Sequence, residues 1–143
     1  MVFLRALMRG GGFELFMAQR VALITGGGKR IGAATVSLLM DNGWFVFIHV
    51  RNSIAEAEEI LNVFEQQNSS KAPAEILQAD LNSDEELEAL IQTVRGHHIV
   101  QKNGGLHALI HNASIYSSQD YESVSLEKLL LNNRLHIEVP FRL

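Results

Sequence analysis

A glycine-rich segment is the first part of this sequence whose residue types and spacing suit chemistry. It runs from Thr25 to Gly32 and reads Thr-Gly-Gly-Gly-Lys-Arg-Ile-Gly. An apolar run precedes it, and apolar residues at helical spacing follow it. Glycines in a strand-to-helix turn let the backbone approach a phosphate, which the N–H groups and dipole of the helix stabilise. The segment predicts a dinucleotide-binding turn, with a flexible connection as the alternative.

A Walker-type phosphate loop does not fit the same segment. That motif requires Ser or Thr after its Gly-Lys pair and a glycine five residues before the pair. Here Arg30 follows Gly28-Lys29, and Leu23 stands where the first glycine belongs. We therefore expect a dinucleotide rather than a nucleoside triphosphate.

The elements that must hold this turn alternate regularly along the chain. The predicted strands are 21–24, 44–50, 75–79 and 106–111. Helical spacing of apolar residues follows each one, in the sets Ile31, Ala34, Thr35, Leu38 and Leu39; Ile54, Ala57, Ile60, Leu61 and Phe64; Leu87, Leu90, Ile91 and Val94; and Leu126, Leu129, Leu130 and Ile137, with Pro140 near the last end. Such alternation predicts an α/β fold: the front half of a Rossmann-type doubly wound parallel sheet, four strands with helices on both faces.

Two helix starts carry the sequence of a capping box. In this motif a serine side chain caps an early backbone N–H, and a glutamate three residues later reaches back to the serine N–H. Ser53 with Glu56, and Ser83 with Glu86, have this spacing. We expect the second and third helices to begin there.

Composition limits the classes of protein that the chain can belong to. Its 143 residues suit one domain, and the absence of cysteine excludes a disulfide framework, a thiolate zinc site and a cysteine nucleophile. A net charge of −4 gives no footprint for nucleic acid, and no apolar run reaches the length of a membrane span. We expect a cytoplasmic protein that binds neither nucleic acid nor membrane.

The first sixteen residues differ from the rest of the chain. They combine an apolar start with Arg5 and three successive glycines, and they lack the long apolar stretch and cleavage site of a signal peptide. We expect residues 1–16 to be a disordered extension and residues 17–143 to form the domain. A helix that binds a membrane surface or a partner is the alternative for the extension.

Three motifs together resemble a known family. They are Thr25-Gly26-x-x-x-Arg30-x-Gly32, the acid Asp80 after the third strand, and His111-Asn112-Ala113-Ser114 after the fourth. In this order they resemble the short-chain dehydrogenases/reductases, whose usual forms have glycine in place of Arg30 and Asn-Asn-Ala-Gly as the last motif. The resemblance runs from about Met17 to Leu143. Arg30, Ser114 and the segment 49–53 look like the pteridine reductase branch, which includes dihydromonapterin reductases.

The resemblance implies a nicotinamide cofactor and the residues that bind it. Asp80 resembles the acid that contacts adenine. The full implied set is Thr25, Gly26, Lys29, Arg30, Ile31, Gly32, His49, Arg51, Asn52, Ser53, Asp80, Leu81, Asn112, Ala113 and Ser114.

Charge around the second strand predicts which nicotinamide cofactor is bound. Enzymes that use NAD place an acid after this strand to bind the ribose 2′-hydroxyl. No acidic residue lies between Asp41 and Glu56, and Arg51 and Ser53 occupy the place instead. Guanidinium and hydroxyl donors suit a 2′-phosphate. We expect NADPH; the alternative for Arg51 is a solvated loop charge.

Fewer residues point to the substrate. By resemblance, Ser114 lies near the nicotinamide and a pterin-like small molecule, and Tyr116 stacks on the pterin; an ordinary loop aromatic is the alternative. His111 is expected to pack at a strand end, and His136 stands where many members have an active-site asparagine. His97 and His98 are expected to diverge on one helix, so we expect no metal site.

The family's proton donor has no counterpart in the chain. The family uses a tyrosine with a lysine four residues later, but Asp120 and Ser125 stand four residues after the two tyrosines, Tyr116 and Tyr121. We therefore expect no catalytic Tyr-Lys pair, a chain truncated before that segment and inactive alone, and a homo-oligomer in the full-length form. The alternatives are another short-chain reductase, of the 3-oxoacyl or sugar-alcohol type, and a non-catalytic nucleotide-binding fragment.

Overall fold

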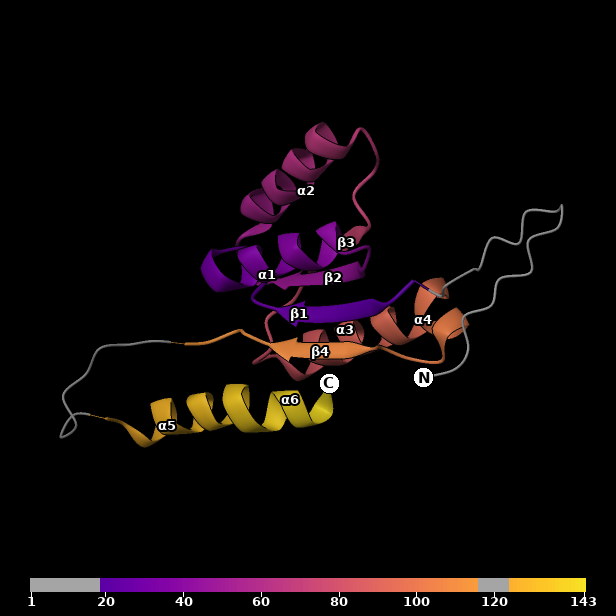
Figure 1. The fold of residues 1–143 in the computed structure, drawn as a ribbon. Coiled ribbons are helices and arrows are strands. Elements are labelled where there is room, and N and C mark those ends of the chain that lie inside the picture. The colour runs from indigo at the N-terminus through magenta and orange to yellow at the C-terminus, as the bar shows by residue number, and fades with distance from the viewer. Residues whose placement is uncertain (1–18, 116–123) are drawn as a thin grey trace, which may run out of the picture.

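The structure, a computed structural model, describes residues 19–115 and 124–143. Its centre is a parallel sheet in the order β3-β2-β1-β4 (Figure 1). The strands are β1 (Val21–Thr25), β2 (Phe45–Val50), β3 (Ala74–Gln78) and β4 (Ala108–His111). The prediction of a four-stranded, Rossmann-type parallel sheet is confirmed.

Helices cover both faces of this sheet, as Figure 1 shows. One face carries α1 (Arg30–Asp41) and α2 (Ile54–Asn68), and the other carries α3 (Asp84–Gly96) and α4 (His98–Asn103). The chain ends in three consecutive helical segments, α5 (Leu126–Asn133), the π-helical η2 (Arg134–Glu138) and α6 (Val139–Arg142). None of the helices in the described ranges is long and apolar enough to cross a membrane.

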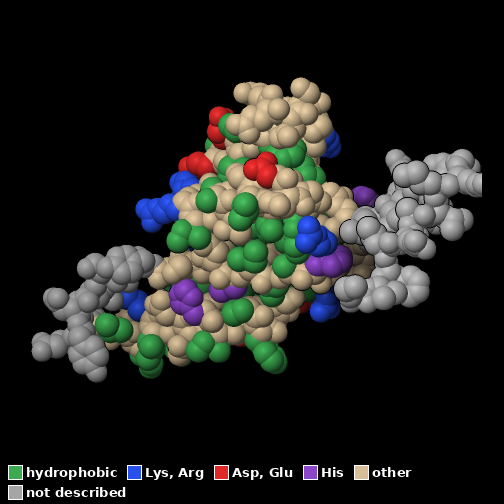
Figure 2. Space-filling view, viewed as in Figure 1, with side chains coloured by type: hydrophobic (Ala, Val, Ile, Leu, Met, Phe, Trp, Pro, Cys, Tyr) green, Lys and Arg blue, Asp and Glu red, His purple; other side chains and the backbone are tan. Residues whose placement is uncertain are grey.

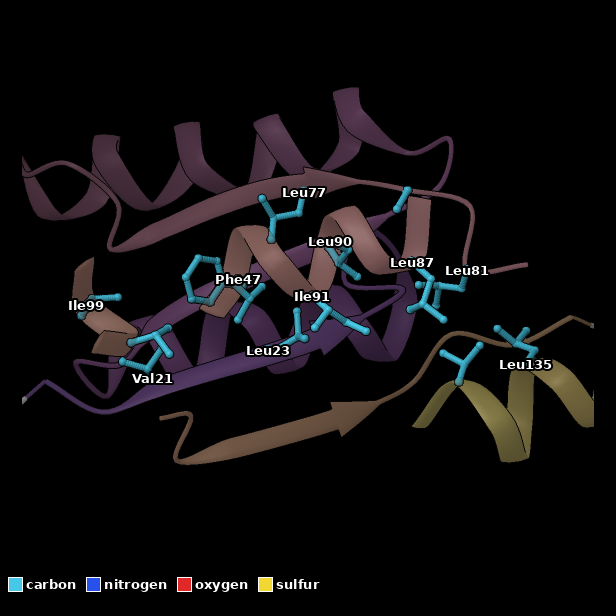
Figure 3. Packing of buried hydrophobic residues seen from close by; sticks show 14 residues of the cluster. Val21, Leu23, Phe47, Leu77, Leu81, Leu87, Leu90, Ile91, Ile99 and Leu135 are labelled. Atoms are coloured by element: carbon cyan, nitrogen blue, oxygen red, sulfur yellow. The ribbon is translucent and has the colours of Figure 1, made fainter. Parts of the chain in front are cut away.

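Two hydrophobic cores lie on the two faces of the sheet. On the α3 face, Leu87, Leu90 and Ile91 pack with Leu23 and Phe47 of the central strands (Figure 3). On the α1 and α2 face, strand residues such as Ile24 and Ile48 pack against both helices. The central strands β1 and β2 are buried on both faces because each face is covered by a helix layer.

The buried face of α1 is not the one that the sequence pattern indicated. Ile31 and Leu38 are 76% and 61% exposed, whereas Gly32, Val36 and Met40 are buried. The reason is a close approach: a Cβ at Gly32 would collide with the carbonyl oxygen of Gly26. The helix packs Gly32 against the preceding turn. This contact, rather than the apolar spacing, sets the rotation of α1 about its axis.

The two predicted capping boxes form only in part. Ser83 caps α3 by accepting the N–H of Glu86 at 3.3 Å, but the Glu86 carboxylate accepts the N–H of Asp80 rather than that of Ser83. Ser53 makes no side-chain cap at α2. Its hydroxyl lies against Gly28, and Glu56 pairs instead with Lys29 at 2.7 Å. The capping box at Ser53 was therefore a wrong prediction, because the glycine turn competes for both partners.

The segment after α3 also differs from expectation. His97 has extended backbone between α3 and α4, so it does not share a helix with His98. The two rings lie 4.4 Å apart between centroids and do not diverge. His97 accepts the N–H of Ile99, and its Nε2 lies 3.3 Å from a carboxylate oxygen of Glu75 in β3. These two contacts hold its ring against the sheet.

The last helical stretch contains a π-helical turn at Arg134–Glu138. Pro140 has no N–H, and its ring excludes the carbonyl of the residue four positions before it, which is His136. The N–H of Val139 bonds the carbonyl of Arg134, five residues back. Leu135 and Val139 face the core, whereas Leu126, Leu129, Leu130, Ile137 and Phe141 are exposed. Figure 2 shows apolar side chains along this helical edge.

Candidate functional site

A cavity of about 540 Å³ opens at the carboxyl ends of the strands. It lies where the chain order reverses between β1 and β4, the position at which open parallel sheets bind ligands. Its lining residues are Gly26, Lys29, Arg30, Ile31, His49, Arg51, Asn52, Ser53, Asp80, Leu81, Asn82, Asn112, Ala113, Ser114, Ile115 and Leu135. Every cofactor residue predicted from the sequence lines this cavity except Thr25 and Gly32, which lie behind it.

Three of the lining residues escaped the sequence reading. Asn82 and Ile115 adjoin predicted site residues, so extending each motif by one or two positions would have found them. Leu135 comes from η2, and it reaches the cavity only because the last helical stretch packs into the core on the α3 face. Tyr116 lies outside the described residues.

The turn after β1 packs tightly against the end of β4. Gly26 has φ +66°, a conformation that favours glycine, and a Cβ there would lie 2.9 Å from the Cα of Ala113. The side-chain amide of Asn112 donates to the carbonyls of Thr25 and Gly26, at 3.2 and 2.9 Å. The glycine turn is thus held from the β4 side by one asparagine.

Thr25 acts behind the cavity through its buried hydroxyl. The oxygen accepts the N–H groups of Asn112 and Ala113, both at 3.1 Å. With both lone pairs occupied, the hydroxyl proton is left for Nδ1 of His111, which lies at 3.1 Å. The proton of the neutral His111 ring is therefore on Nε2.

His111 and His136 face each other at the end of β4. Their rings are nearly perpendicular, with centroids 6.4 Å apart. Burial lowers the pKa of His111, the backbone of Leu135 raises it, and the charge of His136 lowers it. His136 is exposed and does not line the cavity. His111 is a strand-end residue that makes a hydrogen bond as well as packing.

His49 bonds to backbone groups on both sides of β2, after β1 and after β3. Its Nδ1 accepts the N–H of Gly26 at 3.3 Å, and its Nε2 donates to the carbonyl of Ala79 at 3.0 Å. Because an amide N–H only donates and a carbonyl only accepts, the ring is neutral with its proton on Nε2. Burial lowers the pKa of His49, although the bond to Ala79 raises it.

Three cationic side chains line the cavity. Lys29, Arg30 and Arg51 line it, and Asp80 is the lining acid. Lys29 is paired with Glu56, and this hydrogen bond lowers the pKa of the glutamate. No acidic partner of Arg30 or Arg51 is found in residues 19–115 and 124–143. Two guanidinium groups are therefore available to an anion.

The acidic corner of the cavity has a separate organisation. A carboxylate oxygen of Asp80 accepts the N–H of Asn82 at 2.9 Å, and the N–H of Asp80 is held by Glu86 at 2.7 Å. These bonds fix the turn from β3 into α3. The site therefore places cationic donors at the start of α1 and after β2, and a fixed carboxylate after β3.

Comparisons with known proteins agree with this geometry. Residues 20–137 match the short chain dehydrogenase family. Uncharacterized oxidoreductase YgfF of Escherichia coli is 30% identical over 76% of this chain and 41% of its own. Dihydromonapterin reductase of Enterobacter sp. is 30% identical over 87% of this chain and 46% of its own.

A solved structure shows the same arrangement of elements. The FolM alternative dihydrofolate reductase 1 of Brucella canis, complexed with NADP, aligns with a TM-score of 0.70 and 27% identity. The alignment covers 87% of this chain and 46% of that one. The chain thus spans less than half the length of these relatives.

Proposed function

This chain belongs to the short-chain dehydrogenase family, and from this premise we propose that it is the NADPH-binding part of a reductase acting on a pteridine. Residues 17–143 would form the cofactor-binding domain. Membership of the family points to oxidoreductase chemistry. The proposal adds two choices, that of the cofactor and that of the substrate.

The glycine turn suits a pyrophosphate. A Cβ at Gly26 or Gly32 would meet backbone or the Asn112 side chain, so only glycine allows this tight turn at the start of α1. Backbone N–H groups at a helix start stabilise bound phosphate. The residues present therefore fit a dinucleotide. When bound, NADPH supplies the hydride for a reduction.

The unpaired guanidinium groups are the observation that carries the choice of NADPH. Arg30 and Arg51 line one cavity, and in the described part of the chain neither has an acidic partner. Ser53 adds a hydroxyl to the same lining, and the stretch between Asp41 and Glu56 contains no acid to bind a ribose hydroxyl. A 2′-phosphate would compensate both cations. The NADP complexes of the FolM structures support this choice.

Similarity supports the pteridine as substrate. Dihydromonapterin reductases recur among the relatives, and Ser114 lines the cavity beside the end of β4. We propose that Ser114 contacts the pterin and that Tyr116 stacks on it, since an aromatic face suits a flat heterocycle. Asp80, Leu81, Asn112 and Ala113 are proposed to contact the cofactor.

The test of the cofactor choice is the variant Arg51→Ala. A charge-assisted hydrogen bond contributes about 1.5–3 kcal/mol, so NADPH should bind roughly tenfold or more weakly while NADH is almost unaffected. Isothermal titration measures both affinities. Arg95→Ala, which removes an exposed arginine outside the cavity, is the control and should change neither. Equal losses for NADPH and NADH would contradict the proposal.

A further inference from the structure

His49 stands in the predicted cofactor set, yet neither of its ring nitrogens is free for a ligand. Only 2% of the residue is exposed, and both nitrogens are bonded to backbone. In the sheet it lies between Thr25 of β1 and Leu77 of β3, so its ring reaches the chain that leaves each strand. The ring lines the cavity, and both of its nitrogens hold the backbone segments that form the cavity.

The two groups that the ring holds belong to opposite walls of the cavity. Gly26 opens the glycine turn, and Ala79 directly precedes Asp80. The backbone of β2 also reaches both walls: the carbonyl of His49 accepts from Gly27, and the carbonyl of Val50 accepts from Ala79. Each wall is therefore attached to β2 at two points, once by backbone and once by the imidazole.

We propose that His49 is a positioning residue for cofactor binding, whose imidazole holds the glycine turn and the Asp80 segment at the separation that the dinucleotide requires. This inference rests on the proposed function. Two attachment points fix the orientation of a segment as well as its distance, whereas one point leaves it free to rotate. The cavity is then shaped before the cofactor arrives, which lowers the ordering cost of binding.

The neutral ring is essential to this role. An imidazolium would carry a proton on Nδ1 and set it against the N–H of Gly26, so that two donors would face each other. Burial lowers the pKa of His49 and the charge of nearby His111 lowers it further, whereas the hydrogen bond to Ala79 and the charge of Asp80 raise it.

A matched pair of variants tests the proposal. His107 also accepts a backbone N–H through Nδ1, that of Val21 at 3.1 Å, but Val21 begins β1, whereas Gly26 follows its other end. His49→Phe removes both hydrogen bonds of the ring, so NADPH affinity should fall about tenfold. His107→Phe should leave that affinity unchanged. Equal NADPH affinity of wild type and His49→Phe would overturn the inference.

Conservative variants separate positioning from simple stability. His49→Asn can place an oxygen acceptor near Gly26, and His49→Gln can place an amide donor near Ala79. Each should recover part of the NADPH affinity lost in His49→Phe. Recovery of thermal stability by both variants with no recovery of affinity would contradict a positioning role. These two variants also serve if His49→Phe does not fold.

Nuclear magnetic resonance of the wild-type chain supplies a test independent of any variant. The ring ¹⁵N shifts should show the proton on Nε2, and a coupling across the hydrogen bond should join Nδ1 to the amide nitrogen of Gly26. A proton on Nδ1 would overturn this inference and leave the proposed function untouched. Failure of the wild-type chain to bind NADPH would overturn the proposed function, so the two failures are distinguishable.

Discussion

Arg30 occupies a backbone conformation that its side chain disfavours. Its φ is +52°, in the left-handed region, at the position where short-chain dehydrogenases/reductases usually have glycine. A left-handed non-glycine residue costs on the order of 1–3 kcal/mol. The chain tolerates this cost at the mouth of the cavity, where the guanidinium is available to an anion. Strain at a binding site points to a role for the side chain.

The substitution Arg30→Gly should therefore stabilise the fold and weaken cofactor binding. Relief of the strain, less the backbone entropy that glycine loses on folding, leaves a gain of about 1 kcal/mol. NADPH should bind about tenfold more weakly because one charge-assisted hydrogen bond is lost. Urea unfolding and isothermal titration measure the two effects.

Ser69→Gly is the matched control for this change. Ser69 also has positive φ, +51°, but it follows α2 and does not line the cavity. It should give a similar gain in stability with NADPH affinity unchanged. Unchanged NADPH affinity in Arg30→Gly would show that the guanidinium does not contact the cofactor.

At the scale of elements, the last helical stretch depends on charge as well as on apolar contact. Leu135 and Val139 pack into the core on the α3 face, while much of the outer surface of α5 is exposed leucine. Beside these contacts, Arg134 and Arg142 both bond the carboxylate of Asp84 in the first turn of α3. The pKa of Asp84 is lowered, chiefly by the hydrogen bond from Arg134.

Removing this carboxylate should loosen the last helical stretch without unfolding the sheet. In Asp84→Asn, amide hydrogen exchange should speed up in residues 134–142 more than in β1 and β2. Glu85→Gln is the control, since Glu85 lies in the same first turn of α3 and no ion pair of it is found in the described ranges. Equal acceleration of amide exchange in both variants would show that the effect comes from negative charge at the start of α3 and not from the ion pairs of Asp84.

The same ion pairs predict a dependence on pH. The folded pKa of Asp84 lies below its unfolded value of 3.8, so the pair stabilises the fold above that value. This contribution is lost as the pH falls through the folded pKa. Salt should weaken it as well, because Asp84 is exposed to solvent.

At the scale of the whole molecule, cofactor binding and catalysis should be separable. Most of the residues proposed to bind the cofactor line one cavity, but no lysine stands four residues after either tyrosine of the chain. General acid catalysis contributes typically 10²–10⁴-fold. We expect the 143-residue chain to bind NADPH and not to oxidise it with dihydrobiopterin.

Absorbance of NADPH in the presence of dihydrobiopterin measures this turnover. Saturation-transfer spectra of dihydrobiopterin with the NADP⁺-loaded chain test contact with the pteridine separately. Clear turnover would show that another residue donates the proton. Binding of NADPH without any contact to the pteridine would contradict the substrate part of the proposal.

The sequence by itself determined the order of the elements, the parallel sheet and the place of the cavity at the carboxyl ends of the strands. These follow from local signals: apolar runs, helical spacing and a glycine turn between a strand and a helix. Family motifs added nearly all the residues that line the cavity. The inward residues of α3 were also predicted correctly, because their spacing has no competing contact.

Only the tertiary structure decided how the side chains are used. The rotation of α1 depends on the close approach of Gly32 to Gly26 and Asn112, and the Ser53 hydroxyl lies against Gly28 instead of capping α2. The tautomer of His49 depends on Gly26 and Ala79. His49 meets Gly26 across 23 residues, and Thr25 meets Ala113 across 88. Spacing along the chain reports which residues share a face. It does not report which atoms meet, because sheet formation brings these segments together.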